Sequence, residues 1–317
     1  MTTGLDAHRL LYGCMGLGGA WDDAPYGVAD VAQAEAVVEA ALDSGITVFD
    51  HADIYRHGKA EAVFGEVLAR AGDLRQRIVI QTKCGIRLGD GVRPGIYDLR
   101  GQSILRRVEE SLTRLRTDVI DVLLLLHRPD PLADPADVAA ALMSLHRQGL
   151  VRSFGVSNMG AAQVRELQGF LDVPLVANQL EMSLARRDWL EAAVLVNTAA
   201  GAANGFPPGT IEYCRENGLQ LQAWGALAQG RYTGRPETPE QERTAQLVGT
   251  LAEAKGTTPE TVLLWWLQRH PSRIAPVVGS TRPARIRACA DAAAREPELS
   301  HEEWYDLWLT ARGAPLP

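Results

Sequence analysis

The sequence has few cysteines and no excess of positive charge, and each shortage excludes a class of protein. Its 317 residues include four cysteines, Cys14, Cys84, Cys214 and Cys289, and no Cys-x-x-Cys pair. Scattered thiols of this kind are typical of a reduced cytosolic protein, not of a disulfide-bonded or zinc-bound one. Acidic residues number 39 and basic residues 32, which gives a formal net charge of −7. We therefore expect neither a nucleic acid nor an anionic membrane as the main partner.

Long apolar runs are also missing. Residues 1–9 contain no apolar signal core. The most apolar run, residues 119–126, carries Asp121 and is far too short to span a bilayer. We therefore expect a soluble, cytoplasmic protein, and the sequence leaves its oligomeric state open.

What the chain does have is a regular alternation of strand-like and helix-like segments. Between the strands, apolar residues recur at helical spacing, and end signals such as Gly45, Gly149 and Thr258-Pro259 mark the helix boundaries. The predicted strands are residues 10–14, 46–50, 78–83, 119–126, 151–156, 175–178, 219–223 and 274–278. Eight such units without a linker-like run predict a (β/α)₈ barrel, with residues 1–317 as a single domain. The alternative is a doubly wound parallel sheet with an appended domain, which would require a break in composition that the chain does not show.

Two helix starts carry specific expectations. Asp30 and Gln33 resemble a capping box, which predicts that the first long helix begins there. Gly279, Ser280 and Thr281 follow the last predicted strand, and Pro283 is expected to start the next and final helix, which these three residues open as a site for an anion.

Polar side chains stand at the predicted carboxyl ends of the strands. In a parallel barrel these ends meet at one mouth, where the active site of such folds lies. Tyr55 is in the loop that follows the strand ending at Asp50. The strand ends carry Asp50, Lys83, His127, Ser157, Asn158, Gln179, Trp224, Gly279 and Ser280.

Two other interpretations of these residues are possible. Asp50, His51, Asp53 and His57 form a dense cluster that could bind a metal in a barrel hydrolase. Lys83, however, would place an ammonium where that metal should lie, and we expect no metal site. The glycines of residues 16–19 follow a strand but lack the third glycine of a Rossmann turn, so they predict a dinucleotide fingerprint only weakly.

Several motifs in a fixed order resemble those of the aldo-keto reductases. The catalytic Asp, Tyr, Lys and His of that family match Asp50 and Tyr55 in Phe-Asp-His-Ala-Asp-Ile-Tyr, Lys83 in Gln-Thr-Lys-Cys-Gly, and His127 in Leu-Leu-His-Arg-Pro-Asp. Further matches are Arg-Ser-Phe-Gly-Val-Ser-Asn at 152–158, Asn-Gln at 178–179, and residues 276–286. The resemblance covers nearly the whole chain, and His-Arg-Pro-Asp at 127–130 indicates the bacterial oxidoreductase branch.

The resemblance implies that the chain transfers a hydride from NADPH to the carbonyl group of an aldehyde or ketone, a small-molecule substrate. Tyr55 is the implied proton donor. A free tyrosine has a pKa of about 10, and an ammonium at Lys83 should lower that pKa. Asp50 would hold Lys83 charged and in place, and His127 would donate a hydrogen bond to the carbonyl oxygen and orient the substrate.

The resemblance also implies a coenzyme site. Ser157, Asn158 and Gln179 would hold the nicotinamide carboxamide, Trp224 would stack on its ring, and Arg285 with Arg282 would bind the 2′-phosphate. The chain departs from many relatives at Gly279, where they often have Lys, and at Ala288 and Cys289, where they often have Glu and Asn near the adenine. The other residues expected to border the coenzyme are Gly18, Gly19, Gly225, Ala226, Leu227, Gln229, Gly230, Arg231, Gly279, Ser280 and Thr281.

The pocket walls are expected to come from loop residues, namely Trp21, Ile54 and Ile86, with Tyr97 and Phe206 beside them. Two rival functions stay open at this point. One is an NADP-binding regulatory protein with little turnover, and the other is a metal-dependent hydrolase on the same barrel.

Overall fold

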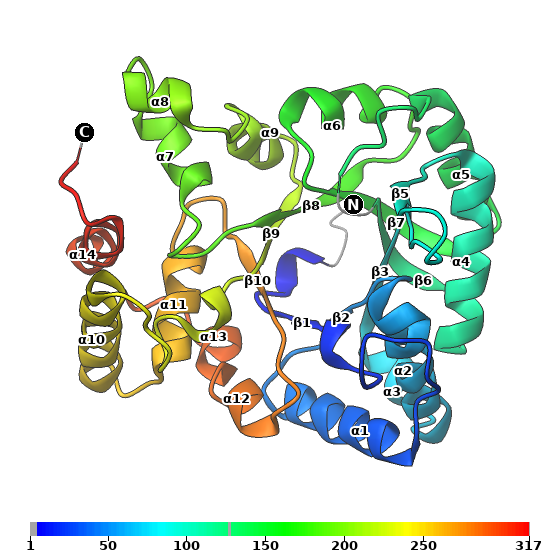
Figure 1. Cartoon of the computed structure of the whole chain (residues 1–317), viewed down its shortest axis with the longest axis horizontal. Coiled ribbons are helices and arrows are strands. Elements are labelled where there is room, and N and C mark those ends of the chain that lie inside the picture. The colour runs from blue at the N-terminus through cyan, green and yellow to red at the C-terminus, as the bar shows by residue number, and fades with distance from the viewer. Residues whose placement is uncertain (1–4, 126–127, 317) are drawn as a thin grey trace.

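The computed structural model describes residues 5–125 and 128–316. Within these ranges, eight parallel strands close a barrel in the order β1-β10-β9-β8-β7-β6-β3-β2, and helices surround it (Figure 1). The prediction of a (β/α)₈ barrel is therefore confirmed. The barrel strands are β1 (Leu11–Gly13), β2 (Val48–Asp50), β3 (Val79–Cys84), β6 (Ile120–Leu125), β7 (Val151–Ser157), β8 (Leu175–Glu181), β9 (Gln220–Trp224) and β10 (Ala275–Val278).

The helices follow the predicted alternation. Thr258 is the N-cap of α11 and accepts a hydrogen bond from the backbone N of Thr261, as its sequence predicts. The helices are α1 (Val28–Asp43), α2 (Lys59–Arg70), α3 (Leu74–Arg77), α4 (Gly101–Leu115), α5 (Pro135–Arg147), α6 (Ala161–Gln168), α7 (Asp188–Val194), α8 (Ala199–Ala203), α9 (Thr210–Glu216), α10 (Pro239–Ala254), α11 (Pro259–Gln268), α12 (Pro283–Arg287), α13 (Ala290–Ala294) and α14 (His301–Arg312). None of these described helices is long and apolar enough to cross a membrane.

Of the two predicted helix starts, the first is wrong and the second is confirmed in part. The first long helix begins one turn earlier than expected, at Val28, because Gly27 is its N-cap and Asp30 reaches back to accept the Gly27 backbone N–H at 2.8 Å. The acidic residue of the motif therefore stands at the third helical position, not at the cap. The helix after β10 begins at Pro283, as predicted, but it is the short α12 and not the final helix, because α13 and α14 follow it.

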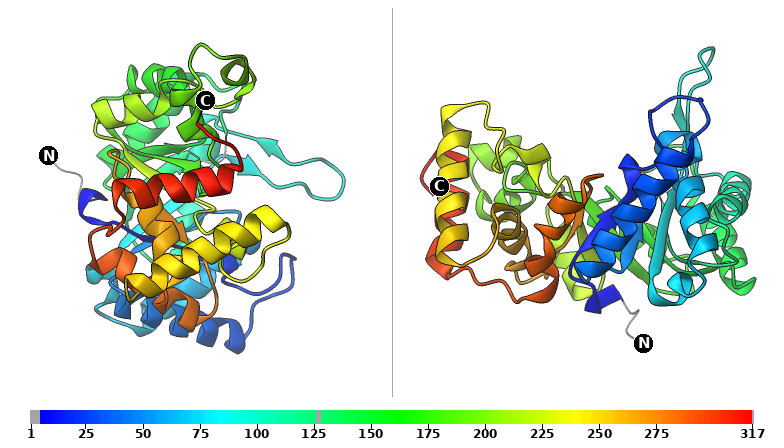
Figure 2. Two further views of the ribbon diagram at one scale, coloured as in Figure 1. Left: turned by 90° about the vertical axis from the view of Figure 1, so that its left-hand side faces the viewer. Right: turned by 90° about the horizontal axis from the view of Figure 1, so that it is seen from below.

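The two ends of the barrel differ. A short 3₁₀ helix, η1 (Leu5–Ala7), closes the amino-terminal end, where Leu5 packs inside the barrel with Val122, Leu124 and Val176. The opposite end carries a hairpin of β4 (Ile86–Arg87) and β5 (Ile96–Tyr97) that projects from the body. Figure 2 shows the hairpin and the amino-terminal helix on opposite sides of the molecule. The mouth is therefore the end that stays open.

The main apolar core lies between the barrel and its helices, where it includes Phe49, Phe64 and Phe154. The last helix is locked onto this core through a tryptophan pair. Trp266 on α11 and Trp304 on α14 stack at 5.2 Å, and each indole N–H donates to the backbone oxygen of the other residue. This packing keeps α14 outside the mouth, against α10 and α11 (Figure 1).

Candidate active site

A buried ion pair stands at the centre of the mouth. β2 ends at Asp50 and β3 carries Lys83, and the Lys83 Nζ lies 2.6 Å from the Asp50 Oδ2. Lys83 also donates to the backbone oxygen of His51 at 2.9 Å and to the Tyr55 hydroxyl at 3.3 Å. The side chains of Lys83 and Asp50 are only 2% and 3% exposed. The structure thus brings together three of the four residues expected to be catalytic, and the fourth, His127, lies outside the described residues.

The loop after β2 aims the Tyr55 side chain at Lys83. Backbone hydrogen bonds from Asp53 N to Lys83 O, 3.0 Å, and from Tyr55 N to Ala52 O, 3.0 Å, tie this loop to β3 and form its turn. The chain then reverses through left-handed φ angles of 53° at Arg56 and 58° at His57, which cost roughly 1–2 kcal/mol per residue. The Lys83 Nζ lies 5.1 Å from the centroid of the Tyr55 ring. The backbone strain therefore sits beside the predicted proton donor.

Burial and charge act against each other on the titratable groups here. Burial raises the pKa of Tyr55 above its ordinary value, although the Lys83 ammonium acts to lower it. The expected lowering of the Tyr55 pKa by Lys83 is therefore outweighed by desolvation. Burial acts to lower the pKa of Lys83, but Asp50 and Tyr55 more than offset this effect and hold that pKa above its ordinary value. At neutral pH the site thus holds a neutral phenol against an ammonium.

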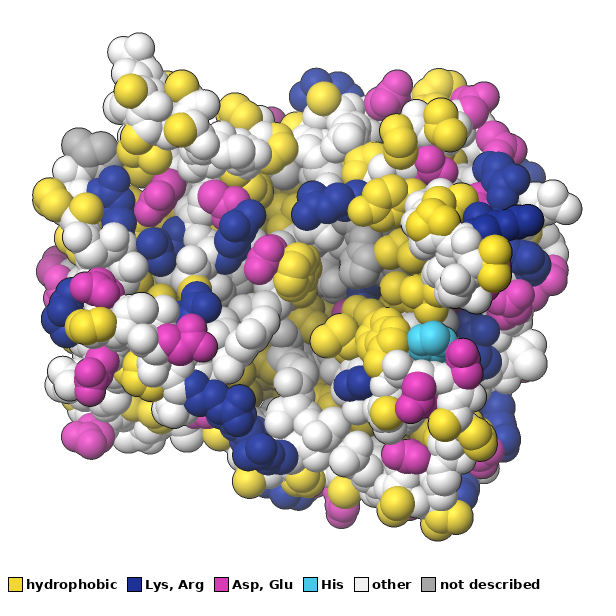
Figure 3. Space-filling model, viewed as in Figure 1, with side chains coloured by type: hydrophobic (Ala, Val, Ile, Leu, Met, Phe, Trp, Pro, Cys, Tyr) yellow, Lys and Arg dark blue, Asp and Glu magenta, His cyan; other side chains and the backbone are white. Residues whose placement is uncertain are grey.

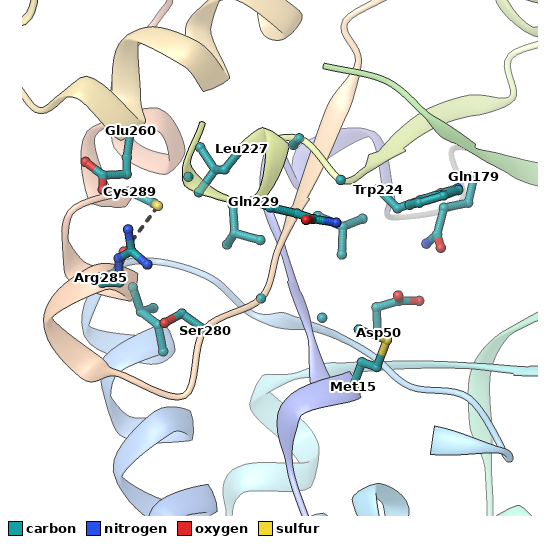
Figure 4. Close-up of a pocket in the computed structure, with 18 of the residues that line it drawn as sticks. Met15, Asp50, Gln179, Trp224, Leu227, Gln229, Glu260, Ser280, Arg285 and Cys289 are labelled. Atoms are coloured by element: carbon teal, nitrogen blue, oxygen red, sulfur yellow. Dashed lines mark hydrogen bonds between the residues drawn. The ribbon is translucent and has the colours of Figure 1, made fainter. Parts of the chain in front are cut away.

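A cavity of about 500 Å³ runs from this ion pair along the mouth. Figure 3 shows the hollow at the centre of the mouth face. In Figure 4, Asp50 and Met15 face Gln179 and Trp224 at one end, and Arg285, Cys289 and Glu260 lie at the other. The predicted residues that line the cavity are Asp50, Tyr55, Lys83, Ser157, Gln179, Trp224, Gly225, Ala226, Leu227, Gln229, Gly230, Gly279, Ser280 and Arg285.

Other residues predicted to border the coenzyme lie outside this lining. Asn158 accepts from the Trp224 indole N–H at 3.3 Å and donates to the Ser157 hydroxyl at 3.1 Å, so it holds the cavity wall from behind. Gly18 has a φ of 83°, and a Cβ there would meet the Lys59 backbone at 2.7 Å, so close packing on α2 accounts for this glycine. The remaining ones are Gly19, Arg231, Thr281 and Arg282.

The residues predicted to contact substrate are also outside the lining. Trp21 is 44% exposed and stacks under the Arg56 guanidinium at 5.5 Å. Ile54, which precedes Tyr55 in the same loop, is buried, and Ile86 pairs with Tyr97 in the projecting hairpin. Phe206 packs against the main core from the segment between α8 and α9.

The sequence alone missed several lining residues. Met15 follows β1 and could have been found from its place at a strand end. Glu260 is the second residue of α11, and only the packing of that helix on the barrel brings it to the cavity. Cys289, which the resemblance placed near the adenine, also lines the cavity. The set that sequence reasoning did not assign is Gly13, Met15, Thr233, Glu260, Val277, Val278 and Ile286.

The backbone after β9 has the shape of a cradle. Gly225 and Gly230 have φ angles of 70° and 85°, and Ala228 and Gln229, between them, also lie in the left-handed region. Across the cavity, a Cβ at Gly279 would come within 3.2 Å of the Gly13 backbone oxygen, so a side chain there would crowd the end of β1. The cavity is long and has a cationic side chain, Arg285, at its far end. These features fit an elongated anionic ligand such as a dinucleotide.

The alternative metal cluster does not assemble. Asp50 is paired with Lys83, Asp53 lies 2.7 Å from the Arg107 Nη1, and His57 lies 2.6 Å from Asp23. Over residues 5–125 and 128–316, no group of three or more His, Cys, Asp or Glu side chains could hold a metal ion. The geometry therefore gives no support to a metal-dependent hydrolase.

Comparisons with known proteins agree with this geometry. Residues 9–307 match the family model described as "Aldo/keto reductase family". The chain is 37% identical over 286 residues to an uncharacterized oxidoreductase, YcsN, of Bacillus subtilis, covering 89% of each chain. It is 36% identical over 292 residues to a 6-dehydroglucose reductase of Novosphingobium aromaticivorans, covering 90% of this chain and 88% of that one. The crystal structure of an aldo-keto reductase from Klebsiella pneumoniae in complex with NADPH superposes with a TM-score of 0.72 at 25% identity, covering 98% of this chain and 92% of that one.

Proposed function

The chain belongs to the aldo/keto reductase family, and from this premise we propose that it reduces the carbonyl group of a small aldehyde or ketone with NADPH. The proposal depends above all on one observation. A single buried ammonium, the Lys83 Nζ, lies 2.6 Å from the Asp50 carboxylate and 3.3 Å from the Tyr55 hydroxyl. This arrangement can deliver a proton at the wall of a cavity long enough for a dinucleotide.

The chain's own residues supply the proton. NADPH, when bound, supplies a hydride to the carbonyl carbon. The Tyr55 hydroxyl donates its proton to the carbonyl oxygen, on which negative charge develops. Lys83 stabilises the phenolate that remains, and Asp50 keeps Lys83 charged and fixed. Burial raises the pKa of Tyr55, so the phenol is protonated at neutral pH, and the Lys83 ammonium, which acts to lower that pKa, favours release of the proton.

Different residues along the cavity would bind different parts of the coenzyme. Ser157, Asn158 and Gln179 would hold the carboxamide of the nicotinamide, and Trp224 would stack on its ring. The loop of residues 225–230, with its positive φ angles, would let the backbone approach the pyrophosphate. Arg285 would bind the 2′-phosphate through charge-assisted hydrogen bonds. His127 stays a prediction as the residue that orients the substrate.

The test follows NADPH absorbance with an activated aromatic aldehyde. We expect steady consumption that Tyr55→Phe lowers by about 10²–10⁴-fold, the range for loss of a general acid, and that a chelator leaves unchanged. Tyr213→Phe is the matched control, because Tyr213 lies on α9 with the Arg165 guanidinium 5.2 Å from its ring. NADPH that binds without being consumed would favour the regulatory alternative. Because a relative is named a 6-dehydroglucose reductase, polyhydroxylated carbonyl compounds belong in the substrate screen.

A further inference from the structure

Four glutamines lie inside the barrel beneath the cavity, where branched apolar side chains usually fill the space. They are Gln81 on β3, Gln179 on β8, and Gln220 and Gln222 on β9, and all are buried. A buried amide without hydrogen-bond partners costs roughly 1–3 kcal/mol, so these four must be paired. They are paired mainly with one another.

The first anchor of this chain of amides is the Asp50 carboxylate. An ionised carboxylate only accepts hydrogen bonds, so Gln81 turns its Nε2 toward the Asp50 Oδ1, at 2.5 Å. The Gln81 Oε1 then accepts from the Gln222 Nε2 at 2.9 Å. This bond fixes which end of the Gln222 amide is nitrogen and which is oxygen.

The second anchor lies at the closed end of the barrel. Gln220 donates its Nε2 to the backbone oxygens of Leu5 at 2.8 Å and His8 at 3.1 Å. Backbone oxygens also only accept, so the Gln220 Oε1 is left to accept from the Gln222 Nε2 at 3.0 Å. Two independent acceptor sets therefore require the same orientation of Gln222.

This orientation of Gln222 determines whether the amide oxygen or the amide nitrogen of Gln179 faces the cavity. The Gln222 Oε1 accepts from the Gln179 Nε2 at 3.0 Å. With its nitrogen held by Gln222, Gln179, which lines the cavity beside Trp224 (Figure 4), has its oxygen left for a ligand. A reversed Gln179 would bring two carbonyl oxygens together.

We propose that Gln222 is a positioning residue that makes Gln179 a hydrogen-bond acceptor, so that the cavity selects a ligand with an N–H donor at the nicotinamide carboxamide. Gln81 and Gln220 act through Gln222 in the same way. The inference rests on the proposed function, because it assumes that the cavity holds the nicotinamide. It differs from a purely structural role for Gln222, which would change stability but not the choice between donor and acceptor groups on a ligand.

The test compares two ligands that differ at this one group. NADP⁺ carries a carboxamide NH₂, and its 3-acetylpyridine analogue carries a methyl group in the same place. Titration calorimetry gives the Kd of each ligand for the full-length protein. We expect the wild-type chain to bind NADP⁺ about 3–10-fold more tightly than the analogue, the effect of one hydrogen bond. Gln222→Leu should reduce this ratio to about 1, because Gln179 is then free to reverse its amide.

Two further variants keep the test decisive. Gln222→Glu, in its protonated form, still accepts from the Gln179 Nε2 and has a hydroxyl to donate to the Gln81 or the Gln220 oxygen, so it should retain the ratio. Gln268→Met is the control, because Gln268 is a buried glutamine on α11 whose Nε2 donates to the backbone oxygens of Arg9 and Ala292. It should alter stability only. Should Gln222→Leu not fold, Gln222→Met, which keeps more of the glutamine's length, takes its place.

The outcomes separate the two proposals. A wild-type chain that binds neither ligand would overturn the proposed function, and the inference with it. A wild-type chain that binds both ligands equally, a Gln222→Leu chain that keeps the wild-type ratio, or a Gln222→Glu chain that loses it would overturn the inference alone.

Discussion

The two ends of the cavity are built in different ways. At the end with Lys83 and Asp50, the side chains are almost fully buried and come from neighbouring parallel strands, and hydrogen bonds fix each charged atom. At the other end, Arg285 and Glu260 are half-buried and come from the first turns of two helices, α12 and α11. There the Cys289 thiol bonds to the Arg285 backbone oxygen at 3.4 Å, and not to its guanidinium.

This difference suggests that the end formed by strands (the strand end) carries out the chemistry and that the end formed by helices (the helix end) provides affinity for the coenzyme. A proton donor must be held in position before the substrate arrives, and strands of a closed barrel give that rigidity. A charged group that grips a phosphate can adjust as it binds. We therefore expect changes at the strand end to lower the turnover number, and changes at the helix end to weaken coenzyme binding.

The largest effect should come from Lys83→Met. Turnover should fall by about 10³-fold or more, because Tyr55 loses the cation that stabilises its phenolate. The free energy of unfolding should also fall by about 3–5 kcal/mol, since the Asp50 carboxylate is left buried without its partner. Steady-state kinetics and urea unfolding measure the two effects.

Lys59→Met is the control for that prediction. Lys59 also forms an ion pair, with Asp22 at 2.8 Å, but the Asp22 side chain is 52% exposed. An exposed pair is worth about 1 kcal/mol or less, so turnover should be unchanged and stability nearly so. Turnover of Lys83→Met within tenfold of wild type would remove Lys83 from the proposed proton-donating group.

The next largest effect belongs to the helix end. Arg285→Ala should raise the Kd for NADPH by about 10–100-fold, the range for a hydrogen bond to a charged group. The Kd for NADH and the turnover number should change little, because neither depends on a 2′-phosphate. Titration with both coenzymes measures the difference.

Two variants control for the charge of this region. Arg287 lies on the same short helix but binds Asp43 at 3.1 Å, so Arg287→Ala should leave the Kd for NADPH unchanged. Glu260→Gln removes an anion from the cavity wall and should tighten NADPH binding by about 2–5-fold. Equal loss of NADH and NADPH binding in Arg285→Ala would assign Arg285 to another part of the coenzyme.

The same contrast explains how far the sequence could be interpreted. Asp50 and Lys83 were predictable because each belongs to a strand that the sequence marks clearly, and parallel strands bring their carboxyl ends together. Glu260 was not, because its position depends on how α11 packs against β10 and α13, which no local pattern encodes. Trp21 belongs to a loop and Ile86 to the projecting hairpin of β4 and β5, and the course of such segments depends on long-range contacts such as that between Arg56 and Trp21.

The glutamines show a second limit. Gln81 and Gln222 were predictable as strand residues, but their partners were not, because hydrogen bonds across a barrel join residues that are distant in the chain. Gln81 and Gln222, which are 141 positions apart, donate one amide hydrogen bond to each other in each direction. A polar residue inside a predicted strand is therefore a signal of a buried network that only the folded barrel can define.

The smallest effect tests whether protonation at the strand end, at His51, lowers the free energy of unfolding at acidic pH. His51 is fully buried and packs at 4.5 Å against Phe64, and neither of its ring nitrogens has a hydrogen-bond partner among the described residues. Burial, together with the nearby Lys83 charge, lowers its pKa from 6.5 to about 3. The unfolded chain therefore takes up the proton first, so the stability that neutral His51 provides is complete above pH 6.5 and is lost as the pH falls toward 3. At one pH unit below 6.5 the loss should be on the order of 1 kcal/mol. Urea unfolding at pH 7.5 and 5.5 should show this loss in the wild-type chain and in the surface control His57→Gln, and show it reduced in His51→Leu.

A His51→Leu chain with the full wild-type loss would mean that acid acts elsewhere and not at the catalytic end. His270, whose pKa burial lowers to about 4, is one such group.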